Sequence, residues 1–226
     1  MLAFTCHLPV ANCQLTLDPF SVLSRNEGER LAHKVLAFAG SPRRGGNSEK
    51  LLDSALAGVA VADPGAAVTK IVLNELKFAP CQNCGFCNTM GYCRFAAGDD
   101  MKGIYEALDA SDRFVIASPI YFASVSAQLK MMIDRCQAIW ARKYLLKRPH
   151  ANPDRKALFL CCGGFKHDRF YKCARQVIAA WSVVLDIRLT GELFYPSIDA
   201  RGQIEKHPTA LADALAAGQA LMNSPA

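Results

Sequence analysis

The strongest constraint on the fold is a regular alternation between short apolar runs and longer segments of helical periodicity. The runs at residues 33–41 and 113–121 have the length and the hydrophobic character of strands that are buried on both faces. The predicted strands cover residues 33–41, 67–76, 113–121, 155–164 and 186–195. The predicted helices cover residues 46–60, 99–111, 126–141, 169–185 and 207–223. This order predicts an α/β fold in which one doubly wound, five-stranded parallel sheet carries helices on both faces.

The length of 226 residues suits this sheet as a single domain, which we place at residues 33–223. Residues 1–32 show no clear period, and we expect them to form a poorly ordered N-terminal extension. The amino terminus lacks the features of a secretory signal, and no window approaches the roughly 18 consecutive apolar residues of a membrane span. We therefore expect a cytoplasmic protein without a membrane partner.

The formal net charge of +6 is modest and suits the binding of phosphate-bearing small molecules or of an acidic protein. A nucleic-acid-binding protein would be better supported by a basic stripe with interleaved aromatic residues, which the sequence lacks. The short basic run at residues 141–150 is typical of a solvated helix end. The sequence therefore predicts no nucleic-acid partner.

In a sheet of this kind, ligands bind beyond the carboxyl ends of the strands, where the strand order reverses. The first such loop, "GSPRRGGNS" at residues 40–48, places hydroxyl groups, arginines and paired glycines before a helix. Backbone amides and the helix dipole at that position favour a monophosphate. The loop lacks the glycine patterns of dinucleotide-binding and P-loop proteins. A plain turn in which Ser48 caps the helix is the alternative interpretation.

Two further strand ends carry groups suited to a flat ring. Pro119 stiffens the loop at residues 118–130, and Tyr121 and Phe122 follow it directly. Gly163 and Gly164 end a later strand and let the backbone approach a ligand closely. Burial of the two aromatic side chains in the core, and a plain turn at the glycines, are the alternatives. Taken with the phosphate loop, these features predict flavin mononucleotide (FMN), a nucleotide with one phosphate and a planar ring system.

Four of the ten cysteines lie within one short segment, as Cys81, Cys84, Cys87 and Cys93. Zinc sites usually combine two C-x2-C pairs that are separated by a dozen or more residues. Three cysteines at successive x2 intervals are instead typical of ferredoxins, in which short loops wrap a [4Fe–4S] cluster. We favour the cluster, and ordinary thiols without a cluster or a bound zinc ion remain the alternatives.

The loops and the cysteine segment together resemble the iron–sulfur flavoproteins, within the NAD(P)H-dependent FMN reductase branch of the flavodoxin-like proteins. The resemblance is specific over about residues 34–150 and includes the compact cysteine motif. It implies that the FMN phosphate is bound by Ser41, Arg43, Asn47 and Ser48. It implies that the isoalloxazine is bordered by Pro119, Ile120, Tyr121, Phe122 and Ser124, and further along by Gly163 and Gly164. A longer gap, "RFAAG", between Cys93 and the acidic pair at residues 99–100 departs from the family pattern.

The resulting hypothesis is an FMN-dependent electron-transfer flavoprotein or oxidoreductase with a [4Fe–4S] cluster in a four-cysteine insert at residues 79–98. We expect a ferredoxin-like protein or NAD(P)H as electron donor, a small-molecule acceptor and a homo-oligomer, and we assign no acid, base or nucleophile. Because the cysteines follow the second strand, we expect them at the flavin edge of the sheet. The alternatives are a cluster-free NAD(P)H-dependent FMN or quinone reductase and a non-enzymatic redox-sensing or zinc-binding protein.

Overall fold

The computed structural model describes residues 32–223. The predicted extension at residues 1–32 lies outside the described residues except for Ala32, and the domain boundaries stay predictions. None of the helices in the described part combines the length and apolar character that crossing a bilayer requires.

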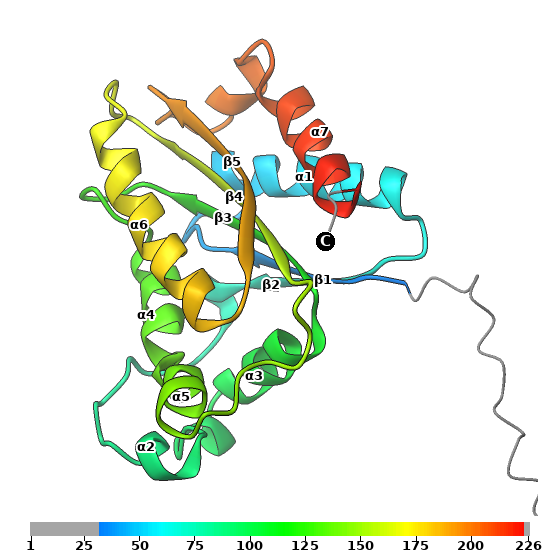
Figure 1. Cartoon of the computed structure of the whole chain (residues 1–226). Helices are drawn as coiled ribbons and strands as arrows, with labels where there is room; N and C mark the ends of the chain where they lie inside the picture. The colour runs from blue at the N-terminus through cyan, green and yellow to red at the C-terminus, as the bar shows by residue number, and fades with distance from the viewer. Residues whose placement is uncertain (1–31, 224–226) are drawn as a thin grey trace, which may run out of the picture. The chain divides into compact units, whose positions relative to one another are not determined.

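Five parallel strands form one sheet in the order β2-β1-β3-β4-β5. Their bounds are β1 Lys34–Ala39, β2 Ala67–Val72, β3 Arg113–Pro119, β4 Lys156–Gly163 and β5 Arg188–Pro196. The chain moves outward from β1 to β2 and then returns to place β3 on the other side of β1 (Figure 1). The strand order therefore reverses between β1 and β3, which is the position where doubly wound sheets bind their ligands.

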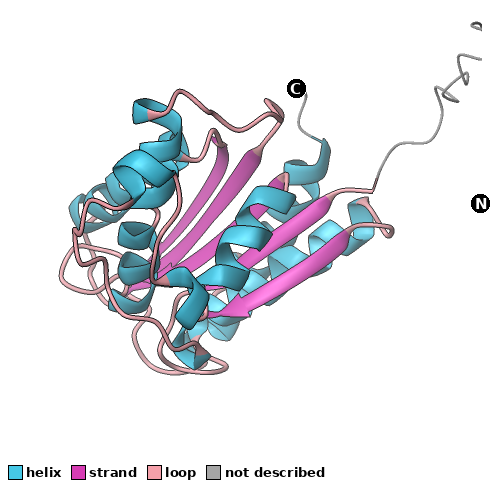
Figure 2. Ribbon diagram, turned by 90° about the horizontal axis from the view of Figure 1, so that it is seen from below, coloured by secondary structure: helices cyan, strands magenta, loops and turns pink. Residues whose placement is uncertain are grey.

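Helices cover both faces of this sheet (Figures 1 and 2). The longer helices are α1 Asn47–Ala62, α3 Met101–Ala110, α4 Ala127–Arg135, α6 Arg169–Val184 and α7 Ala210–Asn223. The short helical segments are η1 Leu73–Glu75, α2 Cys87–Met90, η2 Ala96–Gly98, α5 Gln137–Trp140, η3 Ala141–Leu145 and η4 Gln203–Lys206. Helices α1 and α7 pack on one face, and α3, α4 and α6 pack on the other. The predicted fold class is confirmed.

The two faces of the sheet contribute to two separate hydrophobic cores. Along β1, Leu36 and Phe38 belong to the core beneath α3, α4 and α6, whereas Val35 and Ala37 belong to the core beneath α1 and α7. Successive side chains of a strand point to opposite faces, so a strand that is covered on both faces needs an uninterrupted apolar run. This is why the predicted strands at residues 33–41 and 113–121 lack the polar alternation of a half-exposed sheet, whereas β2 and β5, at the two edges of the sheet, carry polar and exposed residues.

Helices α1 and α7 approach each other through two glycines. A Cβ atom on Gly58 would lie 1.9 Å from the carbonyl oxygen of Leu215, and one on Gly218 would lie 2.0 Å from that of Ala55. No side chain fits in either place, because real Cβ atoms do not come that close to backbone atoms. The two helices therefore pack backbone against backbone above the central strands.

The predicted helix at residues 126–141 is interrupted at Cys136. There the amide of Cys136 donates to the carbonyl of Ile133, three residues back, which tightens the turn before α5 begins. A π-helical turn, Ala141–Leu145, then extends the segment beyond its predicted end. At the last helix, α7 begins at Ala210, two residues after Pro208, so that proline precedes the first helical turn instead of lying in it.

Candidate functional site

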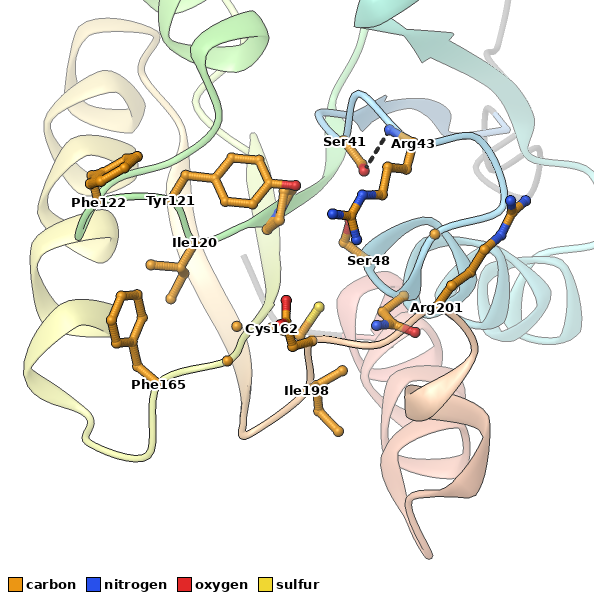
Figure 3. A pocket seen from close by; sticks show the side chains of 16 residues that line it. Ser41, Arg43, Ser48, Ile120, Tyr121, Phe122, Cys162, Phe165, Ile198 and Arg201 are labelled. Atoms are coloured by element: carbon orange, nitrogen blue, oxygen red, sulfur yellow. Dashed lines mark hydrogen bonds between the residues drawn. The ribbon is translucent and has the colours of Figure 1, made fainter.

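A cavity of about 420 Å³ opens at the carboxyl ends of β1, β3 and β4, at the reversal of strand order (Figure 3). Its volume is within the range of about 300–1,000 Å³ that is usual for small-molecule sites. It is lined by Ser41, Arg43, Gly46, Asn47, Ser48, Pro119, Ile120, Tyr121, Phe122, Cys162, Gly163, Gly164, Phe165, Ile198, Asp199 and Arg201. Ten of the eleven residues predicted to bind FMN are among these, and Ser124 is the exception.

The loop between β1 and α1 is folded so that the start of α1 opens into this cavity. Gly45 adopts a φ of +62°, and Gly46 caps the helix. The amide of Gly45 donates to the carboxylate of Glu49 over 2.7 Å, and the hydroxyl of Ser41 accepts from the amide of Arg43 over 3.1 Å. The first amides of the 16-residue α1 remain outside the helical ladder. They offer donors and the positive end of the helix dipole to an anion.

Two arginines flank this helix start. Figure 3 shows the side chains of Arg43 and Arg201 beside the beginning of α1. Arg201 donates from Nη2 to the carbonyl of Arg44 over 2.9 Å, so the loop after β5 contacts the loop after β1. Neither Arg43 nor Arg201 pairs with a carboxylate anywhere in the described part of the chain. Their positive charges are therefore available to a phosphate.

The side chain of Asn47 also contacts the loop after β5. Its amide nitrogen donates to the carbonyl of Ala200 over 2.9 Å, and its amide oxygen accepts from the amide of Ile204 over 3.3 Å. Both ends of the side chain are thus engaged with the loop after β5. Asn47 lies in the cavity wall, and its side chain holds in place the loop after β5, which completes that wall.

The loop after β3 forms a tight turn. Tyr121 and Ser124 exchange two backbone hydrogen bonds of 3.0 and 2.9 Å, and the central residues Phe122 and Ala123 have φ values of +47° and +61°. Phe122 is fully exposed and Tyr121 is 37% exposed, so burial of these rings in the core is ruled out. The Tyr121 ring is directed into the cavity, whereas the Phe122 ring points away from its centre (Figure 3). Ser124 lies on the returning arm of the turn, outside the lining.

The two glycines at the end of β4, Gly163 and Gly164, allow other loops to come close. A Cβ atom on Gly163 would lie 3.3 Å from the Cβ atom of Ile120, and one on Gly164 would lie 3.4 Å from that of Asp199. The neighbouring Cys162 lines the cavity but is buried, and burial raises the pKa of its thiol to about 12. Cys162 is therefore a neutral thiol at physiological pH and contributes shape to the wall.

Three of the six lining residues that were not among the predicted FMN-binding residues come from the loop after β5. Ile198, Asp199 and Arg201 belong to that loop, which carries no recognisable ligand motif. The available signal was positional, because a fifth parallel strand ends at the same edge of the sheet as the others.

The four clustered cysteines line a second cavity, of about 410 Å³, beside α5. Cys81 and Cys84 are exposed, and Cys87 and Cys93 are half-buried. Burial raises the pKa of the Cys87 thiol, and the negative charges that the other three cysteines would carry raise it further. Within residues 32–223, however, no three His, Cys, Asp or Glu side chains are arranged to hold a single metal ion.

Arg135, at the end of α4, contacts both ends of the cysteine segment. Its guanidinium donates to the carbonyl of Ala79 over 2.8 Å and to Sγ of Cys93 over 3.4 Å. It also pairs with the carboxylate of Asp99 over 2.7 Å. A buried positive charge therefore lies in the wall of a cavity whose other polar side chains include four thiols.

The cysteine cavity does not lie at the predicted edge of the sheet. It shares no lining residue with the first cavity. Helix α2 lies near α5, beyond the C-terminal end of α4, whereas the first cavity lies near the loop before the N-terminal end of α4 (Figure 1). Helix α4 has nine residues, and a rise of 1.5 Å per residue makes it about 14 Å long. The expectation that the cysteines lie at the flavin edge of the sheet was wrong. The chain between residues 76 and 100 continues past the end of β2 and reaches the end of α4 that is farther from the first cavity.

Residues 33–180 match the family described as NADPH-dependent FMN reductase. The chain belongs to this family. The family assignment made from the loops and cysteines is thereby confirmed, and the matched range includes three of the loops that line the first cavity and the whole cysteine segment.

Curated proteins that are similar to this chain carry the name iron–sulfur flavoprotein. One from Methanosarcina thermophila is 33% identical over 114 residues, which cover 50% of this chain and 58% of that protein. Another, from Archaeoglobus fulgidus, is 30% identical over 151 residues, which cover 67% of this chain and 64% of that protein. The match therefore spans roughly three fifths of the length of these two relatives.

Solved structures of reductases share the fold. An NAD(P)H:quinone oxidoreductase from Methanothermobacter marburgensis aligns with a TM-score of 0.63 at 16% identity, over 84% of this chain and 96% of that chain. An FMN-dependent NADH-azoreductase from Bacillus anthracis aligns with a TM-score of 0.59 at 13% identity, over 84% of this chain and 100% of that chain. At such low identity these likenesses establish the fold alone.

Proposed function

We propose that the protein is an FMN-dependent oxidoreductase whose flavin binds in the cavity at the reversal of strand order. The observation that carries this proposal is the meeting of three features in one cavity: a helix amino terminus, an inward-directed tyrosine ring, and two arginines that pair with no carboxylate of residues 32–223. Membership of the FMN reductase family supports the same ligand. Bound FMN would supply electron transfer in one-electron or two-electron steps.

Each part of the cavity then has a task. The first amides of α1 and the guanidinium groups of Arg43 and Arg201 bind and neutralise the phosphate. Tyr121 and Ile120 border the flat ring, and the two glycines at the end of β4 keep that side of the cavity narrow. Asn47 positions the loop that carries Arg201. No side chain is needed as an acid or base for electron transfer itself.

We further propose that Cys81, Cys84, Cys87 and Cys93 bind a [4Fe–4S] cluster. The donor set suits it, since four thiolates line one cavity and a buried arginine offsets part of their charge. A preformed zinc site would need its sulfurs about 2.3 Å from one point. Within residues 32–223 no three side chains are arranged in that way, and the two-residue intervals between Cys81, Cys84 and Cys87 are those of cluster-binding segments. The names of the relatives support this choice.

The electron donor that we propose is NAD(P)H or a ferredoxin-like protein, and the acceptor is a small molecule. Within the basic run at residues 141–150, Arg142 pairs with Asp109 and Lys143 pairs with Asp186. Lys147 and Arg148 remain exposed beside this part of the fold and are the better candidates for docking an acidic electron carrier.

We also propose a homo-oligomer. In such an assembly, the flavin of a second copy would lie nearer to the cysteine cavity than the flavin that is bound by the same chain.

Anaerobic purification followed by analysis of flavin, iron and acid-labile sulfide tests both parts. We expect about one FMN, four iron and four sulfide per chain, as a single [4Fe–4S] cluster requires. FMN without iron would instead support the cluster-free reductase, and zinc without FMN would support a metal-binding protein. The absence of FMN would overturn the proposal.

Cysteine variants locate the metal. Cys84→Ser should lower the iron content while FMN is retained, because the two cavities share no lining residue. Cys173→Ser is the matched control, since Cys173 is also exposed but lies on α6 and outside the cysteine cavity. Equal iron loss in both variants would contradict the assignment.

A further inference from the structure

Arg135, the last residue of α4, is a buried cation in the wall of the cysteine cavity. Its side chain is 2% exposed. Its guanidinium makes three kinds of contact, to the carbonyl of Ala79, the carboxylate of Asp99 and Sγ of Cys93. Its Nε–H is also buried and finds no acceptor within residues 32–223. The side chain is thus held in place while part of its donor capacity stays unused.

The surroundings of Arg135 become more negative when the four cysteines of the cavity bind a metal cluster as thiolates. A buried guanidinium is costly unless acceptors or negative charges surround it. Asp99 supplies one negative charge. Cysteine side chains become anionic when they ligate a metal, so an occupied cavity adds negative charge that the empty cavity lacks. Cys93, which already accepts from Arg135, is one of the four candidate ligands.

We propose that Arg135 sets the reduction potential of the bound [4Fe–4S] cluster by donating a charged hydrogen bond to the Cys93 thiolate. The inference rests on the proposed function, because it requires that the four cysteines bind a cluster. Arg135 is a positioning residue in this role, since it acts on the cluster through one of the ligands.

The direction of the effect follows from charge. Reduction adds one electron from a low-potential one-electron donor, and no bond forms or breaks. The site becomes more negative by one charge, so the Arg135 cation stabilises the reduced form more than the oxidised form. Hydrogen bonds to ligand sulfur and the net charge of the site both tune the potentials of such clusters. Arg135 therefore raises the potential, and removing its charge lowers the potential.

The test is a redox titration of the iron-loaded protein, in which the electron paramagnetic resonance signal of the reduced cluster measures the fraction reduced. Arg135→Gln removes the charge, and Arg135→Lys retains it without the planar fork. Arg113→Gln is the control. Arg113 matches Arg135 in its 2% exposure, in its aspartate partner and in an Nε that has no acceptor among the described residues. It donates to Asp112 and Asp154 instead of a cysteine.

For Arg135→Gln we expect at least a tenfold fall in the ratio of reduced to oxidised cluster at a fixed potential, a shift of about 59 mV for a one-electron couple. Arg135→Lys should restore part of this shift, and Arg113→Gln should leave the potential unchanged. An unchanged potential in Arg135→Gln, or an equal shift in Arg113→Gln, would overturn the inference.

Assembly is monitored in the same samples. If neither Arg135 variant retains iron while Arg113→Gln does, Arg135 is required for assembly and the inference about potential is wrong. Iron-free wild-type protein would mean that the proposed cluster itself is wrong, so the two failures are distinguishable.

Discussion

The side-chain amide of Asn47 donates to the carbonyl of Ala200 over 2.9 Å and so connects two residues that are 153 positions apart in the chain. The contact joins the start of α1, where we propose that the FMN phosphate binds, to the loop after β5. Through it, the loop that carries Arg201 is fixed in the cavity wall. The proposed phosphate site therefore depends on a long-range contact as well as on the local fold of the first loop.

Replacing Asn47 by Asp should weaken FMN binding at least about tenfold. The variant loses the donor to Ala200 and places a negative charge beside the phosphate, and hydrogen bonds are worth about 1 kcal/mol each. The unfolding free energy should change by less than about 1 kcal/mol, because an acidic residue is favourable at a helix start. Flavin fluorescence titration and urea unfolding measure the two quantities. Asn47→Ala should show a smaller loss of affinity, and equal losses would contradict the charge argument.

Replacing Arg201 by Gln should lower the affinity for FMN about tenfold and leave the affinity for riboflavin unchanged. The reason is that a charged hydrogen bond to phosphate contributes about 1.5–3 kcal/mol and riboflavin has no phosphate. The exposed Arg175 on α6, paired with Glu192, provides the control Arg175→Gln. Both affinities can be measured by fluorescence quenching. Equal losses for the two flavins would show that Arg201 does not act on the phosphate.

Gly58→Ala should destabilise the protein by about 3 kcal/mol. The new methyl group would overlap the carbonyl of Leu215, and overpacking of this kind forces backbone shifts that cost about 1–3 kcal/mol or more. Gly103→Ala in α3 is the matched control, since nothing lies within 4 Å of a Cβ atom there. That variant should gain up to about 1 kcal/mol from helix propensity. Urea unfolding of both variants should give opposite signs, and the same sign would contradict the packing argument.

The carboxylate of Glu49 should make stability depend on pH in the acid range. Its burial alone raises the pKa, but hydrogen bonds from Lys70 and the Gly45 amide, with the charges of Lys70 and Arg44, outweigh burial and lower the pKa below 4.5. The folded state therefore binds this proton less readily than the unfolded state. The stabilisation is fully present above about pH 4.5 and is lost as the pH falls through the folded-state pKa.

Glu49→Gln should accordingly be less stable than the wild type by about 2 kcal/mol at pH 7, since hydrogen bonds to charged groups are worth about 1.5–3 kcal/mol. The difference should shrink as the pH falls below about 4.5. Urea unfolding of both proteins at several pH values between 7 and 3.5 measures it. A difference that stays constant over this range would show that the carboxylate charge is not responsible.

Much of the fold followed from the sequence because three of the five parallel strands are buried on both faces and so stand out as apolar runs. β1, β3 and β4 are of this kind, and the loops that follow them supplied the predicted flavin residues. Strand ends in a parallel sheet meet at one edge, so Ser41, Tyr121 and Gly163 could be placed together without knowledge of side-chain contacts.

The remaining features depend on contacts that local sequence does not encode. The engagement of Asn47 with Ala200 and Ile204 needs the path of a distant loop. The break at Cys136 arises where α4 gives way to α5, within a sequence whose apolar spacing is that of a continuous helix. The position of the cysteines follows from the contacts of Arg135 with Ala79 and Cys93, and strand order gives no information on these.

The central claim is that the cavity at the β1–β3 reversal binds FMN through its phosphate. The most direct test is an anaerobic calorimetric titration of flavin-free protein with FMN and with riboflavin, which measures the affinity for each flavin. We expect FMN to bind at least about 100-fold more tightly than riboflavin, a difference of about 2.7 kcal/mol that two charged hydrogen bonds to phosphate would supply. Equal affinities for the two flavins, or no binding of FMN, would contradict the claim.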